Sequence, residues 1–168
     1  MEKEKKRRFS LFLFYMTMIS KNKIRKSAED KVKELGGYLV DIKLSLNNII
    51  TIYFDKIEGV SFEDCKELSR YIEEVFDRDI EDYTLNICSA GLDSTFKVDQ
   101  QYHKNIGKEV GVLLLNGKRK RGVIISYDDN LILETRKKKK GTRKEYIKEH
   151  ILIKKEEIKE TKLKLNFT

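Results

Sequence analysis

A regular alternation of apolar and polar positions begins at residue 38. In the segment YLVDIKLSL every second side chain is apolar, which predicts a strand with one buried face. These apolar positions are Tyr38, Val40, Ile42 and Leu44. Asn47-Asn48 can turn the chain, and IITIYFD, rich in β-branched and aromatic residues, can return as a second strand. Residues 38–55 therefore predict a β-hairpin.

A helix is predicted immediately before this hairpin. Ser27 can cap it, Glu29 and Asp30 suit its first turn, and the Gly36-Gly37 pair can end it. The segment SAEDKVKELGG therefore predicts a short helix that leads directly into the first strand.

A second helix is predicted after Gly59, where the hydrophobic period changes from two to about 3.6 residues. In SFEDCKELSRYIEEVFD, Ser61 can cap the helix and Asp64 occupies the capping-box position. The apolar stripe consists of Phe62, Cys65, Leu68, Ile72 and Val75. YTLNICS then supplies a third strand, so residues 27–96 predict a two-layer α/β domain with two helices on a three-stranded sheet.

The remaining residues, 97–168, have the pattern of a small all-β domain. KEVGVLLL, KRKRGVIISYDD and NLILET predict three strands, and Asn116-Gly117 between the first two is a strong hairpin signal. Gly122 suggests a bulge or sharp bend. The apolar positions Ile151, Ile153 and Ile158 and the terminal KLKLNF can close the sheet. The expected fold is an SH3-like or Sm-like β-barrel, which makes the whole chain an α+β protein.

Charge divides the chain in the same places. Residues 1–26 hold nine Lys/Arg and two Glu, whereas residues 27–96 hold seven basic and sixteen acidic side chains, a net charge of −9. Residues 97–168 hold twenty basic and ten acidic side chains, a net charge of +10. An acidic domain followed by a basic one favours two domains with different partners, and the basic one favours a polyanion.

The first twenty residues, MEKEKKRRFSLFLFYMTMIS, have a basic start and an apolar run from Phe9 to Ile19. This run is shorter than the roughly 20 residues that span a bilayer, and no A-x-A-like cleavage site follows it. An export signal, a membrane-surface anchor and a start codon placed too early all fit. We favour the third as a hypothesis, since Met16 and Met18 are possible internal starts.

The sequence contains no complete catalytic or metal-binding motif. Cys65 and Cys88 lack C-x-x-C spacing, and only His103 and His150 could complete a metal site with them. A nucleophilic Cys88 or Ser89 would need a placed base, and the P-loop run G-x-x-x-x-G-K-[ST] is missing. We therefore expect no catalytic residues and no metal site.

Two basic clusters are the candidate binding residues. The first follows the Asn116-Gly117 turn and would project from a hairpin tip; it consists of Lys118, Arg119, Lys120 and Arg121. The second lies in a long loop or second hairpin; it consists of Arg136, Lys137, Lys138, Lys139, Lys140, Arg143 and Lys144. Such side chains can reach phosphates, and the scarcity of aromatics among them favours recognition of RNA backbone and shape over base stacking. A solvated charged loop with no partner is the alternative.

The order of segments resembles the bacterial ribosome maturation factor RimP family across about residues 27–168. The segments are GYLVDIKLS, YFDKIEGVSFEDCKELSRYIEEVFD, YTLNICSAGLDSTF and IGKEVGVLL, of which GVSFEDCKELSR is the most specific. The resemblance implies a cytoplasmic, non-enzymatic assembly factor without a cofactor. It also implies binding to the immature 30S subunit, with 16S rRNA and a small-subunit ribosomal protein as partners and no membrane. A free-standing Sm-like RNA-binding regulator is the alternative; it would form a ring, whereas we expect a monomer.

The segment expected to join the two domains departs from the family pattern S-P-G-L-D-R-P. This chain has Ser89, Ala90, Gly91, Leu92 and Asp93, followed by Ser94 and Thr95, so both prolines and the arginine are missing. Alanine and threonine restrict φ less than proline does. We therefore expect a more flexible junction, and a contact made by the family arginine does not carry over to Ser94.

Overall fold

The structure is a computed structural model that describes residues 20–45, 48–77, 79, 82–91, 94–138 and 146–164. Contacts divide the chain into two compact units, Met1–Ala90 and Gly91–Thr168. We call them the N-terminal unit and the C-terminal unit. The proposed domain boundary after residue 96 stays a prediction.

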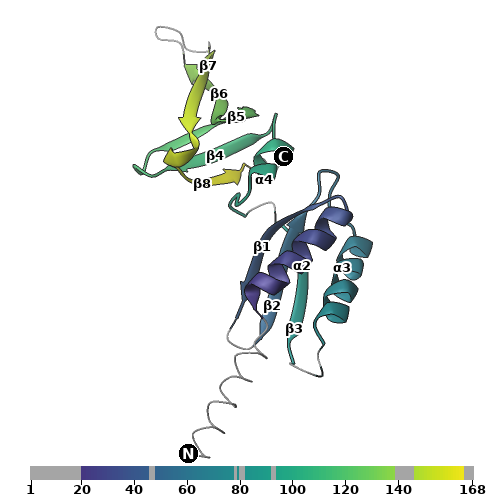
Figure 1. The fold of residues 1–168 in the computed structure, drawn as a ribbon. Coiled ribbons are helices and arrows are strands. Elements are labelled where there is room, and N and C mark those ends of the chain that lie inside the picture. The colour runs from purple at the N-terminus through teal and green to yellow at the C-terminus, as the bar shows by residue number, and fades with distance from the viewer. Residues whose placement is uncertain are drawn as a thin grey trace, which may run out of the picture. The chain divides into compact units, whose positions relative to one another are not determined.

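The N-terminal unit is a two-layer α/β structure (Figure 1). Its elements are α2 (Lys21–Glu34), β1 (Tyr38–Leu44), β2 (Ile49–Asp55), α3 (Phe62–Val75) and β3 (Thr84–Ser89). The sheet has the order β1-β2-β3, with β1 antiparallel and β3 parallel to β2. Helices α2 and α3 pack side by side against one face of this sheet, as predicted.

The core of the N-terminal unit lies between the two layers. Helix α2 contributes one buried row, Ile24, Ala28 and Val32, which recurs every four residues as a helix face requires. The sheet contributes Ile42, Ile50, Ile52 and Phe54, and α3 contributes Leu68 and Ile72, all of them 0% exposed. Alternate positions of β2 are buried because one face of the sheet packs against the helices.

Three local predictions for this unit need correction. Helix α2 begins at Lys21, six residues before Ser27, because Ile24 is buried on the same face as Ala28. Phe62 is 80% exposed and Val75 47% exposed, so the buried stripe of α3 is narrower than its apolar sequence pattern. Strand β1 has an irregular register between Leu39 and Asp41, which the simple alternation did not reveal.

The predicted ends of α3 and α2 are confirmed. The Ser61 hydroxyl accepts a hydrogen bond from the Asp64 amide at 3.1 Å, and the Asp64 carboxylate accepts one from the Ser61 amide at 2.8 Å, which together form a capping box. At the end of α2, Gly36 has φ +77°, the left-handed conformation that favours glycine.

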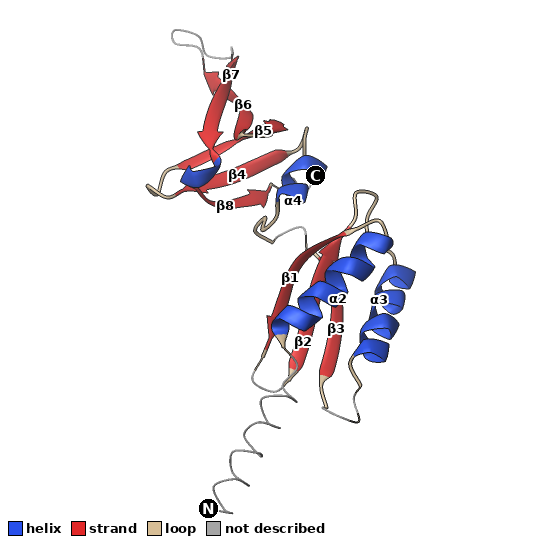
Figure 2. Cartoon of the chain, viewed as in Figure 1, coloured by secondary structure: helices blue, strands red, loops and turns tan. Residues whose placement is uncertain are grey.

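The C-terminal unit is a five-stranded antiparallel sheet with one short helix (Figure 2). Its elements are α4 (Asp99–Lys104), β4 (Glu109–Leu114), β5 (Arg119–Tyr127), β6 (Asn130–Lys138), β7 (Tyr146–Lys154), the 3-10 turn η1 (Lys155–Glu157) and β8 (Ile158–Leu163). The strand order is β7-β6-β5-β4-β8, so the last strand pairs with the first one of this unit.

One core serves this whole sheet. Its buried residues come from α4 and from four strands; they are Tyr102, Val110, Val112, Leu114, Ile124, Tyr127, Leu131, Leu133 and Ile153. Ile158 and Leu163 of β8 pack against the same cluster. Helix α4 was not predicted, because its six residues carry only one large apolar side chain, Tyr102, which stacks on Tyr127 at 3.9 Å between ring centroids.

The barrel prediction is confirmed only as far as an antiparallel sheet. Among the described residues, β7 pairs with β6 alone and β8 with β4 alone, so the hydrogen-bonded order does not close. The predicted irregularity at Gly122 is displaced: register is continuous there, and the shift falls between Ile124 and Ser126. Glycine is still required, because a Cβ at Gly122 would lie 2.6 Å from the Glu134 carbonyl oxygen.

In the part of the chain that the structure describes, no helix is long and apolar enough to cross a membrane. The apolar run of residues 9–19, and with it the choice among export signal, anchor and misplaced start, lies outside the described residues.

Candidate nucleic-acid interface

The first basic cluster was predicted at a hairpin tip, but three of its four residues lie on strand β5. Only Lys118 is in the turn, where its amide donates to the Asn116 side-chain oxygen at 3.0 Å. Because Gly117 adopts φ +80° and closes the turn tightly, strand β5 begins at Arg119. The other three cationic residues of the cluster therefore point alternately to the two faces of the sheet.

Arg119 and Arg121 share the outer face of the sheet. Arg121 pairs with Gly111 of β4, and its guanidinium forms a two-bond contact with Glu109, at 2.7 Å from Nε and 2.9 Å from Nη2. This bidentate geometry orients the guanidinium firmly for an exposed pair. Lys120 lies opposite the buried Val112 and is half-buried, so it faces away from the two arginines.

The second basic cluster begins on a two-stranded ribbon. Strand β5 pairs with β6 only as far as Glu134, whereas β6 continues to pair with β7 out to Lys138 and Tyr146. We call residues 135–138 and 146–149 the basic ribbon. Its described cations are well exposed: Arg136 and Lys137 on β6, with Lys148 opposite Arg136 on β7.

The structure describes only part of the second basic cluster. The residues Lys139, Lys140, Arg143 and Lys144, and the side chain of Lys138, lie outside the described part of the chain. Lys148 contacts Glu134, which adjoins the ribbon, at 2.9 Å, and Lys137 contacts Glu149 at 3.6 Å within it. These pairs are exposed on the lysine side, and such surface pairs hold a side chain only weakly.

Three cationic residues near these clusters were not predicted from the sequence. Lys148 joins the ribbon from β7, and Lys162 and Lys164 lie on the outer face of β8 and its extension, beside β4. The alternation in TKLKL was a signal for this, because it places both lysines on the face opposite Thr161 and Leu163. That β8 adjoins β4 was not evident from the sequence.

The predicted junction residues are described in part. The Ala90 amide donates to the Phe54 carbonyl at 3.0 Å, and the Ser94 amide donates to the Gly91 carbonyl at 3.0 Å. Ser89 ends β3, while Leu92 and Asp93 lie outside the described residues. The expectation of a flexible junction stays a prediction.

Neither cysteine lies in a site built for nucleophilic or metal chemistry. Cys65 packs against the core of the N-terminal unit, and burial raises the pKa of its thiol, which disfavours the reactive thiolate. Cys88 is a half-buried free thiol on β3. Among the described residues there is no group of three or more His, Cys, Asp or Glu side chains arranged to hold a metal ion.

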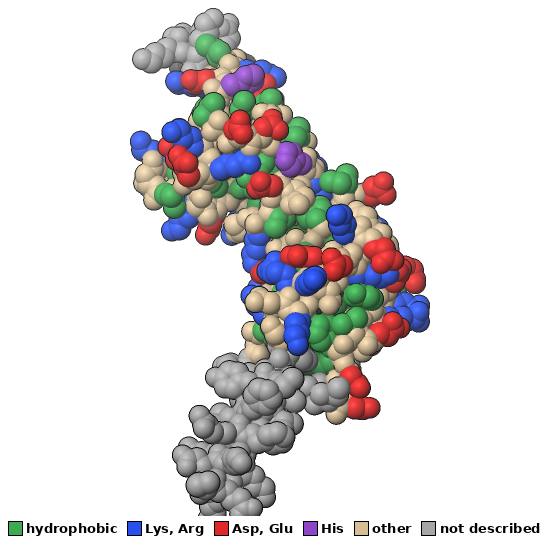
Figure 3. Space-filling view, in the orientation of Figure 1, with side chains coloured by type: hydrophobic (Ala, Val, Ile, Leu, Met, Phe, Trp, Pro, Cys, Tyr) green, Lys and Arg blue, Asp and Glu red, His purple; other side chains and the backbone are tan. Residues whose placement is uncertain are grey.

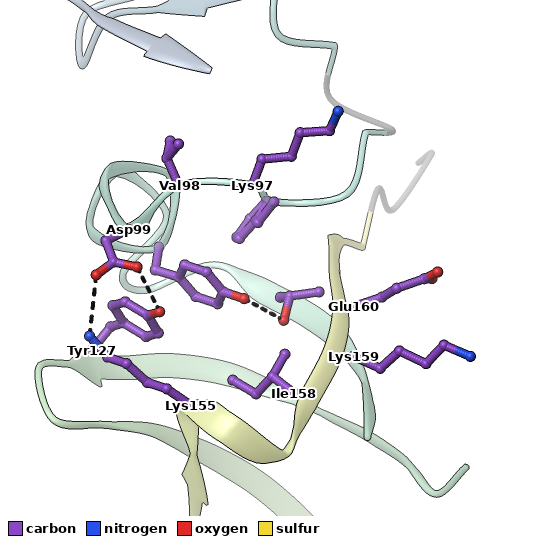
Figure 4. A pocket seen from close by; sticks show the side chains of 11 residues that line it. Lys97, Val98, Asp99, Tyr127, Lys155, Ile158, Lys159 and Glu160 are labelled. Atoms are coloured by element: carbon purple, nitrogen blue, oxygen red, sulfur yellow. Dashed lines mark hydrogen bonds and ion pairs between the residues drawn. The ribbon is translucent and has the colours of Figure 1, made fainter. Parts of the chain in front are cut away.

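A small pocket of about 170 Å³ beside α4 contains a polar network (Figure 4). The Tyr127 hydroxyl donates to Asp99 at 2.9 Å, Lys155 approaches the same carboxylate at 3.3 Å, and the Lys155 ammonium lies 4.1 Å from the Tyr127 ring centroid. Burial, and then the bond to Asp99, raise the pKa of Tyr127, so it stays a protonated donor. The network ties α4 to β5 and η1, which is a structural role.

Both units carry acidic and basic side chains on their surface, and they differ in the ratio of the two. Figure 3 shows both acidic and basic side chains on the visible face of each unit. The cations of the C-terminal unit that can act together are therefore those brought onto one ribbon or one sheet face by strand pairing, and these are the candidate interface.

Comparison with known proteins decides the family. A model of the RimP N-terminal domain matches residues 27–93. A ribosome maturation factor RimP from Christiangramia forsetii is 33% identical over 152 residues, which is 88% of this chain and 99% of that protein. The chain belongs to the RimP family.

Other RimP proteins align over a shorter stretch. The ribosome maturation factor RimP of Porphyromonas gingivalis strain W83 is 38% identical over 109 residues, or 65% of this chain and 72% of that protein. The one from Flavobacterium psychrophilum is 33% identical over 96 residues, or 56% of this chain and 62% of that protein. The resemblance seen in the sequence is thereby confirmed.

Proposed function

We propose that this RimP-family chain assists maturation of the small (30S) ribosomal subunit by binding the immature subunit through its 16S rRNA and a small-subunit ribosomal protein. The chain acts in the cytoplasm as a monomer, without catalysis and without a cofactor. Family membership supports the ribosomal role. The basic ribbon is the observation that carries RNA binding, since it extends cationic side chains beyond the sheet.

The geometry of the ribbon favours contact with RNA backbone. Arg136 and Lys148 are cross-strand neighbours on one face of the ribbon, and Lys137 lies on the other. Side chains on both faces of a narrow two-stranded element can meet phosphates on either side of it without moving the core. Each phosphate neutralised releases counterions, so binding weakens as salt rises.

The same proposal includes a curled, Sm-like or SH3-like form of the five-stranded sheet. Its support is that residues from α4 and all five strands pack into a single cluster, as they do when a sheet bends round its own core. Measuring cross-strand nuclear Overhauser effects between β7 and β8 tests this directly. Their presence supports closure, and a complete absence in an assigned spectrum contradicts it.

Binding is tested by cosedimentation of the full chain with immature small subunits across a salt series. Replacing Arg136, Lys137 and Lys148 by Gln removes three cations from the ribbon. If all three contact phosphates, the slope of log affinity against log salt falls in magnitude by about 2.1–2.7, at roughly 0.7–0.9 per contact. The matched control replaces Lys21, Lys23 and Lys26, three exposed lysines of α2, by Gln. An unchanged slope in the ribbon variant, or an equal change in the control, contradicts the assignment.

The biological role is tested by sucrose-gradient profiles of a strain lacking the protein. The expected result is a deficit of mature small subunits with accumulation of a precursor, restored by the full chain. Rescue by a variant that begins at Met18 would also support the misplaced-start hypothesis. Normal subunits in the deletion strain would contradict the maturation role. A ring on gel filtration, in place of a monomer, would favour the alternative of an Sm-like RNA regulator.

A further inference from the structure

The outer face of the C-terminal sheet contains a groove with basic walls that neither sequence cluster defines by itself. Strands β5 and β8 both pair with β4, and their registers place Arg121, Gly111 and Lys162 in one row across the sheet. The neighbouring row on one side is Arg119, Leu113 and Glu160. On the other side, Lys164 lies beside Glu109, its amide donating to the Glu109 carbonyl at 2.9 Å.

Gly111 makes the centre of this face hollow. It lies between two core-facing valines, so its own position faces outward, and it has no side chain to fill that space. Among the residues that the structure describes, a Cβ placed there would have one neighbour within 4 Å, the Lys164 side chain at 3.9 Å. The resulting open cavity of about 500 Å³ is lined by the residues of these rows other than Glu109, and also by Val112, Lys120 and Leu163.

The walls of the groove carry the charge. Arg119 and Arg121 belong to β5, whereas Lys162 and Lys164 belong to β8 and its extension, and all four are exposed. Glu109 is matched by its bidentate pair with Arg121. Glu160 is the exposed carboxylate in the lining. Because the charge of Arg121 is offset by Glu109, the net positive charge beside Gly111 comes chiefly from Lys162 and Lys164.

The spacing of these walls suits one extended polyanion. Two strands that flank a third lie roughly 9.6 Å apart, which sets the backbone spacing of the two walls. Along a strand, residues two apart on one face are separated by about 6.8 Å, which is comparable to the distance between successive phosphates of a nucleic-acid strand. Phosphates on one backbone can thus meet Arg121 and Lys162 from the two sides in turn.

We infer that this groove, centred on Gly111 and walled by Arg119, Arg121, Lys162 and Lys164, binds the sugar-phosphate backbone of a single RNA strand. The inference deepens the proposed function and rests on it, because it names a second RNA contact besides the basic ribbon and the form of RNA that it takes. The carboxylate of Glu160 limits binding at its end of the groove by repelling phosphate.

Three variants of the full chain test the groove by different means. Lys162→Gln with Lys164→Gln removes charge from one wall. Gly111→Val fills the hollow without changing charge; Gly111 does not have a positive φ, so a β-branched residue suits this strand position. Glu160→Gln removes the repulsive carboxylate. The matched control replaces Lys154 and Lys159, two exposed lysines of the C-terminal unit that do not line the groove, by Gln.

The probe is a short fluorescent oligouridylate, with a duplex RNA of the same length and a polyglutamate peptide as competitors. The double lysine variant is expected to lower the salt slope by about 1.4, at roughly 0.7 per single-strand phosphate contact. Gly111→Val is expected to weaken binding with its melting temperature kept or raised. Glu160→Gln is expected to strengthen binding, an effect that a merely structural role would not produce.

Several results would overturn the inference. They are oligouridylate binding by Gly111→Val equal to that of the unchanged chain, an equal loss in the Lys154/Lys159 control, or displacement of the RNA by polyglutamate as effectively as by unlabelled oligouridylate. The proposed function is judged separately, with immature small subunits. If the unchanged chain binds subunits while the groove variants lose nothing, only the groove is wrong. If oligouridylate binding depends on the groove but subunits are not bound, only the proposed function is wrong.

Discussion

The two units of this chain use β-sheets in opposite ways. In the N-terminal unit one sheet face is covered by helices α2 and α3, and acidic residues predominate, with a net charge of −9 over residues 27–96. In the C-terminal unit a single core includes residues of all five strands, and the candidate binding residues lie on an outer sheet face and on a ribbon. The difference teaches that a charge excess becomes a candidate binding surface only where strand pairing aligns the side chains.

The largest expected effect, on the free energy of unfolding, tests whether the two cores are separate. Phe54 is completely buried in the N-terminal core, so Phe54→Ala should cost about 3–5 kcal/mol of unfolding free energy. Hydrogen exchange should then show lost amide protection in β1, β2 and β3, with β4 to β8 unchanged. Phe62→Ala, at a residue that is 80% exposed, is the matched control and should stay within about 0.5 kcal/mol. Equal loss of protection in both units would show that they unfold together.

The C-terminal unit is tested at its two strand glycines. Gly122→Ala should destabilise by about 1–3 kcal/mol, because the new Cβ would lie 2.6 Å from a backbone oxygen of β6 that cannot move away cheaply. Gly111→Ala faces open space and should be neutral, or more stable by about 0.4–1 kcal/mol. Urea unfolding of both variants measures the contrast. Similar stabilities would contradict the close approach of β6 to β5 at Gly122.

The capping box of α3 gives a smaller effect in the N-terminal unit. Ser61→Ala removes the side-chain acceptor for the Asp64 amide and should cost about 1 kcal/mol by thermal unfolding. Ser20→Ala serves as the control, because Ser20 caps α2 without a side-chain hydrogen bond and its loss should cost less. The reverse order of the two effects would show that the box does not stabilise α3.

The smallest expected effect is a loss of stability at low pH. The hydrogen bond from Lys56, and then those from Ser61, lower the pKa of Asp64 from 3.8 to about 2. Because this pKa lies below that of the unfolded chain, the carboxylate stabilises the fold above about pH 4, and this stabilisation is lost as the pH falls towards 2. Unfolding free energies of the unchanged chain and of Asp64→Asn should therefore converge over that interval. A constant difference between them would contradict the shift.

Local signals were enough for several elements of both units. Strand β2 has the predicted bounds of Ile49–Asp55, and α3 has the predicted Ser61 cap, because strand-forming residue types and capping residues act through neighbours in sequence. The Asn116-Gly117 turn was equally evident. Helix α4 and the true start of α2 were missed for the converse reason: Tyr102 and Ile24 are recruited by cores assembled from distant segments.

The candidate interface divides in the same way. The lysines and arginines of residues 118–121 and 136–144 were evident as charge in the sequence, and so was the tight turn that precedes the first group. The face of the sheet on which each side chain lies was not evident from the sequence. Arg119 and Arg121 lie on the same face because β5 begins at Arg119, directly after the turn. The role of Lys162 and Lys164 depends on a pairing between strands that are far apart in the chain.

The sequence by itself determined the family, the order of α/β and all-β segments, and the division between an acidic and a basic part. The family is evident from motifs such as GVSFEDCKELSR, and the other two properties follow from periodicity, turn residues and charge within short stretches of the chain. Only the tertiary structure decided that β8 lies beside β4 and that an outward glycine opens a groove between two basic walls. Strand order depends on non-local hydrogen bonds and on the burial of one shared core, and no short segment contains that information.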